Sequence, residues 1–273
     1  MKPYLNIGCG NVFHETWENI DLVANSPQVR QHDLAKGLPY DDNTFDAVYA
    51  SHLLEHISSS SAPGFIQECA RVAKSGAVLR FVVPDFEVMV RSYLEILEQA
   101  ATGDREAIAR HAWIVNEIID QSVRSESGGS MKHFILAHQH EPVMEFIRSR
   151  IGQEANAVLN EGASTCSNST FSYKASLLYR FASQKLLTSL AWLLLGGKGR
   201  SAVQQGFLKI SGEIHQWIYD RVSLQQLLEK HCSQVAKMDA FTSGIPGFSS
   251  FGLDVRNGAI RKPDSLFMEG IKA

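Results

Sequence analysis

The sequence has few cysteines and no cysteine pair. Its four cysteines are scattered, and no two of them form a Cys-x-x-Cys motif: Cys9, Cys69, Cys166 and Cys232. Such spacing indicates neither a thiolate zinc site nor a disulfide framework. Cys9 is the one that lies in a notable motif, and there its backbone is expected to matter more than its thiol.

An excess of positive charge is also lacking. The 273 residues carry a formal net charge of -3 at pH 7, with a pI near 6.4. Domains that bind nucleic acid usually have a basic excess. We therefore exclude nucleic acid as the expected partner.

No hydrophobic run is long and uncharged enough to span a membrane. The most apolar stretch, residues 176–195, is interrupted by Arg180 and Lys185, whereas a span needs about 20 nearly uncharged residues. This stretch is predicted to be either a helix of a substrate cap or an amphipathic helix in peripheral contact with a membrane or lipid-linked substrate. Since Met1 to Pro3 leads straight into a predicted strand, we expect no signal peptide and a cytoplasmic protein.

What the sequence does have is a glycine turn after a short apolar strand. Tyr4–Ile7 is followed at once by Gly8-Cys9-Gly10, and a second predicted strand ends at Asp21. Glycine lets the backbone turn sharply and approach a ligand closely. In a parallel sheet ligands bind outside the carboxyl ends of the strands, where an acidic side chain can accept ribose hydroxyls. A nucleoside-containing cofactor is the first hypothesis.

The segment between the two strands is short. Only residues 11–17 remain for a helix, which is room for a turn or two, so we predict a truncated first helix. The third glycine of the dinucleotide fingerprint is missing, because Val12 stands at its place. Both features count against an NAD-type enzyme.

Further strands and helices follow in order. Val29–Asp33 is predicted to be a third strand and Phe45–Ala50 a fourth, followed by the polar Ser51 and His52. Apolar periodicity predicts a helix from Ser60 that stops at Gly76. A fifth strand is predicted over 78–83, and the last two over 235–241 and 266–271, the final one antiparallel.

Five ordered motifs together resemble a class I S-adenosylmethionine-dependent methyltransferase of the type 11 methyltransferase domain family. They are Leu5–Gly10, Asn19–Asp21, Leu38–Asp46, Leu54–His56 and Arg71–Ala77. The resemblance covers about residues 4 to 85, with a weaker part from His215 to the C-terminus. It implies a Rossmann-like α/β fold with a seven-stranded, mostly parallel sheet and helices on both faces.

The resemblance also implies S-adenosyl-L-methionine as cofactor, lying across the strand ends. The residues expected to bind it are Gly8, Cys9, Gly10, Asp21, Leu22, Asp33, Leu34 and Ser51. Within this set the Asp33 carboxylate is expected to face the adenine amino group.

Histidines supply the candidate base. His52 and His56 follow the fourth strand, and histidine can take a proton from a hydroxyl near neutral pH. The other interpretation is that they only order the loop. A metal pair at these two residues is disfavoured by their place after the fourth strand and by the lack of nearby thiols, and the cluster from His133 to His140 fits no familiar ligand spacing. We predict no metal site.

The expected organisation has three parts: a cofactor-binding half over 1–85, a helical insertion and candidate substrate cap over 86–212, and a C-terminal part over 213–273 that completes the sheet. We predict that His215 and Tyr219 bind the acceptor, and they share one face if their segment is helical. The expected acceptor is a small molecule or saccharide that is methylated at a hydroxyl or amine.

Two rival functions are a nucleotide-dependent oxidoreductase and a non-catalytic cofactor-binding protein.

Overall fold

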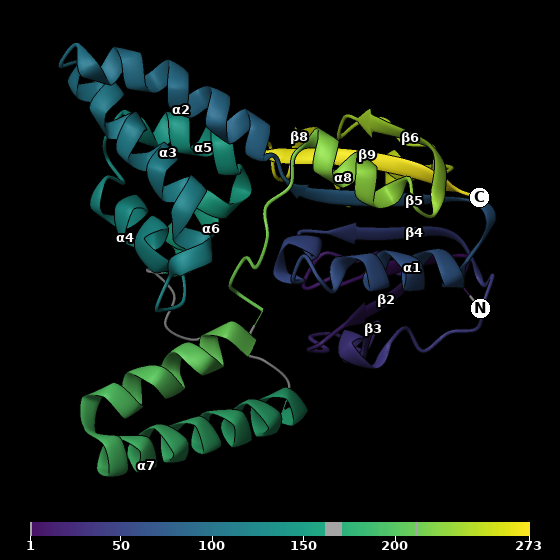
Figure 1. Cartoon of the computed structure of the whole chain (residues 1–273), viewed down its shortest axis with the longest axis horizontal. Helices are drawn as coiled ribbons and strands as arrows, with labels where there is room; N and C mark the ends of the chain where they lie inside the picture. Colours follow the sequence, from purple (N-terminus) through teal and green to yellow (C-terminus); the bar gives the residue numbers. More distant parts are fainter. Residues whose placement is uncertain (1, 162–170, 211) are drawn as a thin grey trace.

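The computed structural model describes residues 2–161, 171–210 and 212–273, and it is built around one seven-stranded sheet (Figure 1). The sheet has the order β3-β2-β1-β4-β5-β9-β6. Its strands are β1 (Tyr4–Ile7), β2 (Glu18–Asp21), β3 (Val29–Gln31), β4 (Phe45–Ser51), β5 (Ala73–Pro84), β6 (Cys232–Met238) and β9 (Ser265–Lys272). A separate two-stranded ribbon joins β7 (Val255–Arg256) to β8 (Ala259–Ile260).

The first five strands are parallel and β9 is antiparallel to both of its neighbours. Ile7 of β1 pairs with Ile20 of β2 and with Ala50 of β4, so the carboxyl ends of these three strands meet at one edge. Leu79 of β5 pairs with Gly270 of β9 in the opposite direction. The predicted Rossmann-like α/β class, with its antiparallel last strand, is confirmed.

The described residues form eight α-helices and three short 3-10 helices. They are η1 (Leu34–Lys36), η2 (Leu54–His56), α1 (Ala62–Val72), α2 (Phe86–Ala101), α3 (Arg105–Val123), α4 (Gly129–Ala137), α5 (Val143–Ile151), α6 (Gln153–Glu161), α7 (Phe171–Ile210), α8 (Arg221–Leu228) and η3 (Phe248–Phe251). The described parts of residues 86–210 are thus mainly helical, as predicted.

The two faces of the sheet are covered differently. On one face α1 and α8 bury Ile66 and Leu224 against strand residues such as Leu79. On the other face Trp17 and Phe248, the latter from η3, pack on Tyr49 of β4. Burying apolar side chains on both faces explains why the central strands are nearly continuous hydrophobic runs.

The helices between β5 and α8 form a core of their own. Trp113 of α3, Ile135 of α4 and Ile147 of α5 are buried together. In Figure 1 these helices stand beside the sheet at the ends of β5 and β9. The division of the chain into three parts stays a prediction.

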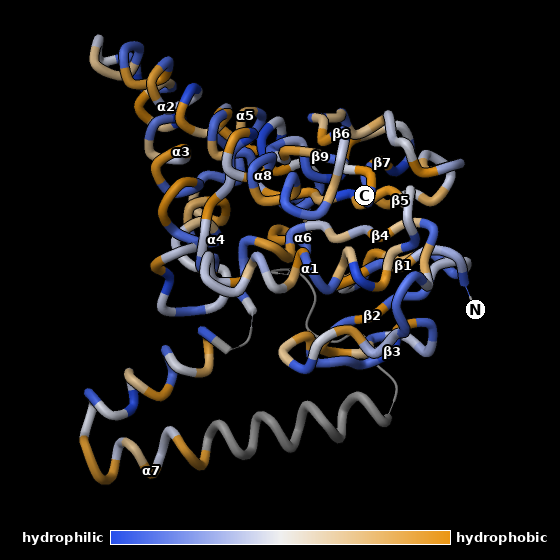
Figure 2. The backbone as a smooth tube through the Cα atoms, turned by 45° about the vertical axis from the view of Figure 1, so that its right-hand side comes forward, coloured by the Kyte–Doolittle hydropathy of each residue, from blue (hydrophilic) through white to orange (hydrophobic). Residues whose placement is uncertain are grey.

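Helix α7 extends away from this body as a hairpin. Its backbone leaves the helical region at Gly196 (φ 66°), where two helical arms meet, and Figure 2 shows strongly apolar chain at that bend. The predicted membrane-contact segment, 176–195, lies partly outside the described side chains, which resume at Leu186. Within the described part of the chain, no helix combines the length and hydropathy needed to cross a bilayer.

Two local predictions on the N-terminal half are wrong. The segment between Gly10 and β2 contains turns and no helix, because Trp17 and the loop near η3 fill that face instead. The first helix after β4 ends at Val72, and Gly76 lies inside β5 with φ 78°. Glycine there accommodates the shifted register between β4 and β5.

Local hydrogen bonds determine two features near the C-terminus. The segment from His215 to Tyr219 is not helical, because the amides of Gln216 and Trp217 donate to Glu55 O in the η2 turn. The N-cap of α8 is Asp220, whose side chain accepts from Val222 and Ser223 amides. Ser223 is the third helical residue and completes a capping box with Asp220.

Candidate functional site

The glycine turn has the geometry that the sequence predicts. Gly8 and Gly10 both adopt positive φ, at 64° and 51°, and the amides of Gly8 and Cys9 donate to Ile20 O at 2.9 and 3.2 Å. A Cβ at Gly8 would lie 2.9 Å from the Leu53 side chain. The turn is therefore a tight backbone concavity that a larger residue would strain and obstruct.

Asp21 lies directly against this turn. Its Oδ2 accepts from the Gly10 amide at 2.8 Å, and its Oδ1 accepts from the Val23 amide at 3.0 Å. The bond to Gly10 joins the ends of β1 and β2. The carboxylate thus reaches the edge where the parallel strands end, as the sequence predicts.

Cys9 does not supply a nucleophile. Burial, reinforced by the nearby Asp21 charge, raises the pKa of its thiol to about 12. Since the thiolate is the reactive form, Cys9 is inert at neutral pH. The described cysteines Cys9, Cys69 and Cys232 are all buried and free, and Cys166 lies outside the described residues.

A cavity of about 420 Å³ opens beside the turn, a size that suits a small ligand. Five of the predicted residues line it: Gly8, Cys9, Gly10, Ser51 and His52. The predicted Asp21, Leu22, Asp33, Leu34, His56, His215 and Tyr219 are outside this lining.

Asp33 and Leu34 sit at the end of the neighbouring strand. Asp33 caps η1, because its Oδ1 accepts from the Ala35 amide at 3.0 Å, and its side chain is exposed. The His32 amide donates to Asp21 O at 2.8 Å, which fixes this segment next to β2. Asp21 and Asp33 therefore lie at the same edge of the sheet, and a role of Asp33 at an adenine stays a prediction.

His52 is the histidine that faces the cavity. It follows β4 with φ 50°, a conformation that non-glycine residues seldom adopt. Its Nε2 lies 2.8 Å from Ser265 Oγ and its Nδ1 lies 3.3 Å from Glu55 Oε1. The ring is thus held from both sides, with only 11% of the side chain exposed.

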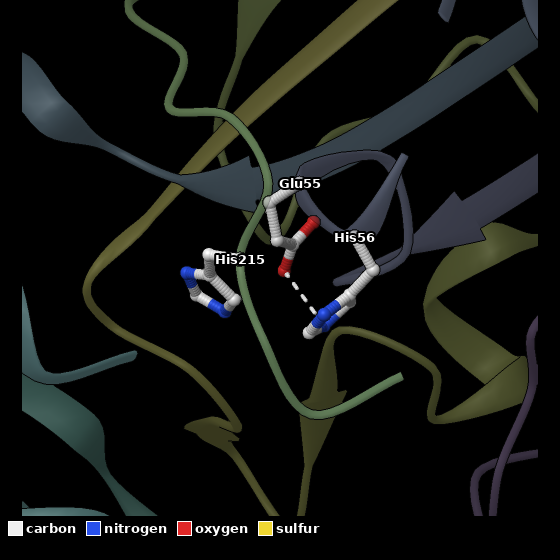
Figure 3. Close-up of side chains that lie close together, drawn as sticks. All are labelled: Glu55, His56 and His215. Carbon is white, nitrogen blue, oxygen red and sulfur yellow. Dashed lines mark ion pairs between the residues drawn. The ribbon is translucent and has the colours of Figure 1, made fainter. Parts of the chain in front are cut away.

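His56 and His215 come together next to it, around Glu55 (Figure 3). The two imidazole rings are edge to face with centroids 4.8 Å apart, and His56 Nε2 is 3.9 Å from Glu55 Oε1. Sequence reasoning predicted roles for both histidines and included Glu55 only as part of the Leu54–His56 motif. No local motif could join residues 55 and 215, which only the tertiary fold brings into contact.

Tyr219 lies away from the main cavity. It is buried, its hydroxyl has no hydrogen-bond partner among the described residues, and it lines a second cavity of about 250 Å³ with Trp217 and Ser59. His215 and Tyr219 are therefore not side by side on a helical face. Their predicted contact with an acceptor stays a prediction.

The helical region reaches the main cavity through α6. Glu154 and Ala157 line the cavity, and Glu154 pairs with Lys262 at 2.6 Å. A Cβ at Gly152, just before α6, would lie 2.6 Å from Arg261 O, so the two segments are in close contact. Sequence reasoning missed Glu154, Arg261 and Lys262, because neither periodicity nor a motif marks them.

Comparison with family models matches residues 11–81 to a family described as "Methyltransferase domain". This match confirms the predicted resemblance over the part of the chain that contains β2, β3, β4, α1 and most of β5. Comparison with curated proteins found no match.

Several solved structures are similar over part of the chain. A SAM-dependent methyltransferase from Archaeoglobus fulgidus is 16% identical, with a TM-score of 0.27 over 33% of this chain and 50% of that one. A putative sarcosine dimethylglycine methyltransferase from Galdieria sulphuraria is 19% identical, with a TM-score of 0.26 over 35% and 44%. A putative methyltransferase from Bacillus halodurans is 21% identical, with a TM-score of 0.24 over 34% and 51%. The chain thus spans about half of the length of these solved proteins or less.

Proposed function

We propose that this chain is an S-adenosyl-L-methionine-dependent methyltransferase that transfers a methyl group to a hydroxyl or amine of a small-molecule or glycan-type acceptor. The observation that carries the proposal is the match of residues 11–81 to a methyltransferase domain. The site supports it, because Gly8–Gly10 and Asp21 form a cradle at the strand ends beside a cavity of about 420 Å³.

The residues present fit the cofactor. A Cβ at Gly10 would meet no atom within 4 Å, so the backbone of the turn is open to a ligand there, whereas the space beside Gly8 is filled by Leu53. Under the proposal the turn and Ser51 contact the amino-acid part of the cofactor, Asp21 and Leu22 its ribose, and Asp33 and Leu34 its adenine. Bound there, the cofactor supplies a reactive sulfonium methyl group.

The chain's own contribution is mainly orientation. Holding the acceptor atom in line with the methyl group lowers the barrier by converting a bimolecular step into a positioned one. His52 lines the cavity and is held between Glu55 and Ser265, so it is placed to take the proton of an acceptor hydroxyl. His56 is the second candidate base, and it lies outside the cavity lining.

Cofactor binding is the first test. Calorimetric titration of the purified protein with S-adenosylmethionine should show one site, and Asp21→Asn should weaken binding at least about tenfold because a charge-assisted hydrogen bond to ribose is lost. Asp46→Asn, at an exposed ion pair with Lys74, is the matched control and should bind normally. Binding of NAD in place of S-adenosylmethionine would instead establish the rival oxidoreductase.

The base assignment is tested by alanine substitution at His52 and His56, singly and together. We expect kcat with the true acceptor to fall by about 10²–10⁴-fold when the base is removed, and the effect to be carried by His52. The affinity for the cofactor serves as the control for folding. Unchanged turnover in the double variant would refute the assignment.

The acceptor pocket is proposed to include the helical segment over 86–212, since Glu154 and Ala157 of α6 line the cavity beside Lys262 and Arg261. Paired charges in the lining of a cavity suit a polar acceptor such as a saccharide. His215 and Tyr219 are proposed to lie on its path. Methyl transfer to extracted glycans from radiolabelled cofactor, with Lys262→Met as the impaired variant, tests this assignment.

We also propose that α7 contacts an anionic membrane surface. Leu193, Leu194 and Leu195 are 71–75% exposed at the bend of the hairpin, an unusual placement for adjacent leucines. From residue 162 to 212 the sequence has no Asp or Glu but six basic residues: Lys174, Arg180, Lys185, Lys198, Arg200 and Lys209. An apolar tip within a purely basic segment matches a surface of acidic lipid head groups.

A further inference from the structure

Glu55 is a buried acid whose close side-chain contacts, among the described residues, are with imidazole rings. Only 1% of its side chain is exposed, and neither carboxylate oxygen accepts a hydrogen bond from any residue that the structure describes. A buried ionised carboxylate is costly unless it is paired or binds a metal. Its nearest cationic candidates are imidazoles, at 3.3 Å for His52 Nδ1 and 3.9 Å for His56 Nε2.

His56 presents a free lone pair to this carboxylate. Its Nδ1 lies 3.2 Å from Ile214 O, and because a carbonyl oxygen only accepts, Nδ1 carries the proton of the neutral ring. Nε2 is then unprotonated and faces Glu55. A backbone carbonyl that fixes the far nitrogen is the usual second partner of a metal-binding histidine.

The backbone around His215 is held firmly to the η2 turn. Glu55 O accepts from the amides of Gln216 at 2.7 Å and Trp217 at 3.1 Å, and the His215 amide donates to Gln121 O at 2.9 Å. The Gln216 side chain donates to His56 O at 2.7 Å. These bonds bring His215 to Glu55 from a distant part of the sequence, so the group is part of the fold.

We propose that Glu55, His56 and His215 form a binding site for one divalent transition-metal ion. One ligand atom from each residue lies within 4.8 Å of the others (Figure 3). Two imidazole nitrogens and one carboxylate are a ligand set for Zn²⁺, Fe²⁺ and related ions, with coordination positions left open. This site goes beyond the proposed methyl transfer and does not depend on it.

The geometry needs only a small adjustment. Around an ion with bonds of about 2.1 Å, ligand atoms of a tetrahedral site are about 3.4 Å apart, so the widest separation must close by about 1.4 Å, within reach of side-chain rotation. His52 contacts Glu55 and lines the cavity. The ion would therefore be one side chain removed from the cavity, and His52 remains the candidate base.

The test uses the full-length protein without a histidine tag, stripped with a chelator and dialysed. Calorimetry with Zn²⁺ alone and visible absorption with Co²⁺ alone should both show one equivalent bound per chain, without cofactor present. Glu55→Gln and His215→Gln should each weaken Zn²⁺ binding at least about 10–100-fold, the loss expected even for an outer partner of a ligand. His133→Gln removes an exposed His–Glu pair on α4 and should bind as the wild type does.

If a variant fails to fold, the Zn²⁺ and Co²⁺ measurements on the wild type still decide the proposal. Absence of a stoichiometric Zn²⁺ site and of the Co²⁺ bands of a low-coordinate site would overturn it, leaving Glu55 as the centre of a histidine network only. Binding that His133→Gln removes and Glu55→Gln retains would also overturn it, because the ion would then sit on surface histidines. Neither result bears on cofactor binding, which is measured separately.

Discussion

Arg80 is the most completely buried charge of the sheet, and it lies directly behind the cavity wall. Its guanidinium donates to Asp254 at 2.8 Å and to Glu269 at 2.7 Å, and to the carbonyls of Thr242 and Asp239. Asp254 in turn accepts from the Tyr49 hydroxyl, and both Tyr49 and Asp254 line the cavity. The network therefore links β5 and β9 to Asp254, which lies in the loop after η3 and lines the cavity.

Removing Arg80 should be strongly destabilising. Arg80→Met leaves two buried carboxylates without their partner, and breaking a buried ion pair in this way typically costs about 3–5 kcal/mol. Urea unfolding followed by circular dichroism measures the loss. Lys74→Met is the matched control on the same strand, since its pair with Asp46 is about half exposed, and it should cost about 0–1 kcal/mol. Equal losses in the two variants would contradict this account.

At the scale of single residues, sequence reasoning predicted the local geometry correctly where its signal was local. Gly8, Gly10 and Asp21 were predicted because a glycine turn and a carboxylate at a strand end are short-range patterns, and the Gly10–Asp21 hydrogen bond confirms their proximity. Glu55 appeared only as part of the Leu54–His56 motif. Its burial and its contact with His215 arise from the tertiary fold, and neither can be read from neighbouring residues in the sequence.

Among the elements, α1 is tied to the loop after β3 by a pair of charged residues. Glu68 accepts from Arg71 at 2.8 Å and from the Leu38 amide at 3.0 Å, and Arg71 also donates to the carbonyls of Leu38 and Tyr40. The loop from Leu38 to Asp46 belongs to the motifs that resemble the family. Glu68 and Arg71 thus fasten this loop to the C-terminal part of α1.

These contacts should give stability a pH dependence in acid. Hydrogen bonds from Arg71 lower the pKa of Glu68 to about 2 from an ordinary 4.5. Because the folded pKa lies below the unfolded one, the stabilisation is fully present above pH 4.5 and is lost as the pH falls toward 2. The side chain is 32% exposed, so solvent screening reduces its contribution to about 1 kcal/mol.

The measurement is the unfolding free energy of Glu68→Gln against wild type from pH 7 to pH 2.5. The variant should be less stable by about 1 kcal/mol at pH 7, and the two curves should converge below pH 4.5. Glu98→Gln, at an exposed position of α2, controls for removal of one negative charge. A difference that stays constant down to pH 2.5 would show that Glu68 acts through packing.

The elements that sequence reasoning missed have a common physical cause. Strands β1, β4 and β9 and the helical character of the insertion were predicted correctly because buried runs and helical periodicity are properties of a single segment. Gly76 continues a strand, and the segment from His215 to Tyr219 is not helical, because both follow the hydrogen bonds of a neighbour. Tertiary pairing overrides local preference at such places.

At the scale of the whole molecule, α7 exposes more large apolar side chains than a surface in contact with water usually does. Its described arm exposes Leu186, Leu187, Leu190 and Trp192 in addition to the three leucines at the bend. The whole chain has a net charge of -3, and residues 162–212 contribute +6 to it. The rest of the chain therefore has a net charge of -9, opposite in sign to that of this segment. A chain divided in this way is suited to rest on an acidic lipid surface with α7 while the acidic body faces water.

Vesicle binding should therefore need both lipid charge and the apolar bend. We expect the wild type to sediment with phosphatidylcholine vesicles that contain phosphatidylglycerol, and much less with phosphatidylcholine alone or at high salt, where the charge is screened. Combined Leu193→Ser, Leu194→Ser and Leu195→Ser substitution should weaken binding at least about tenfold, because each leucine loses part of the 1.5–3 kcal/mol of a buried side chain. Leu94→Ser with Ile119→Ser, at exposed positions of α2 and α3, is the matched control. If the triple variant binds vesicles normally but changes from dimer to monomer in size-exclusion chromatography, the apolar bend joins two copies of the chain and the membrane proposal is refuted.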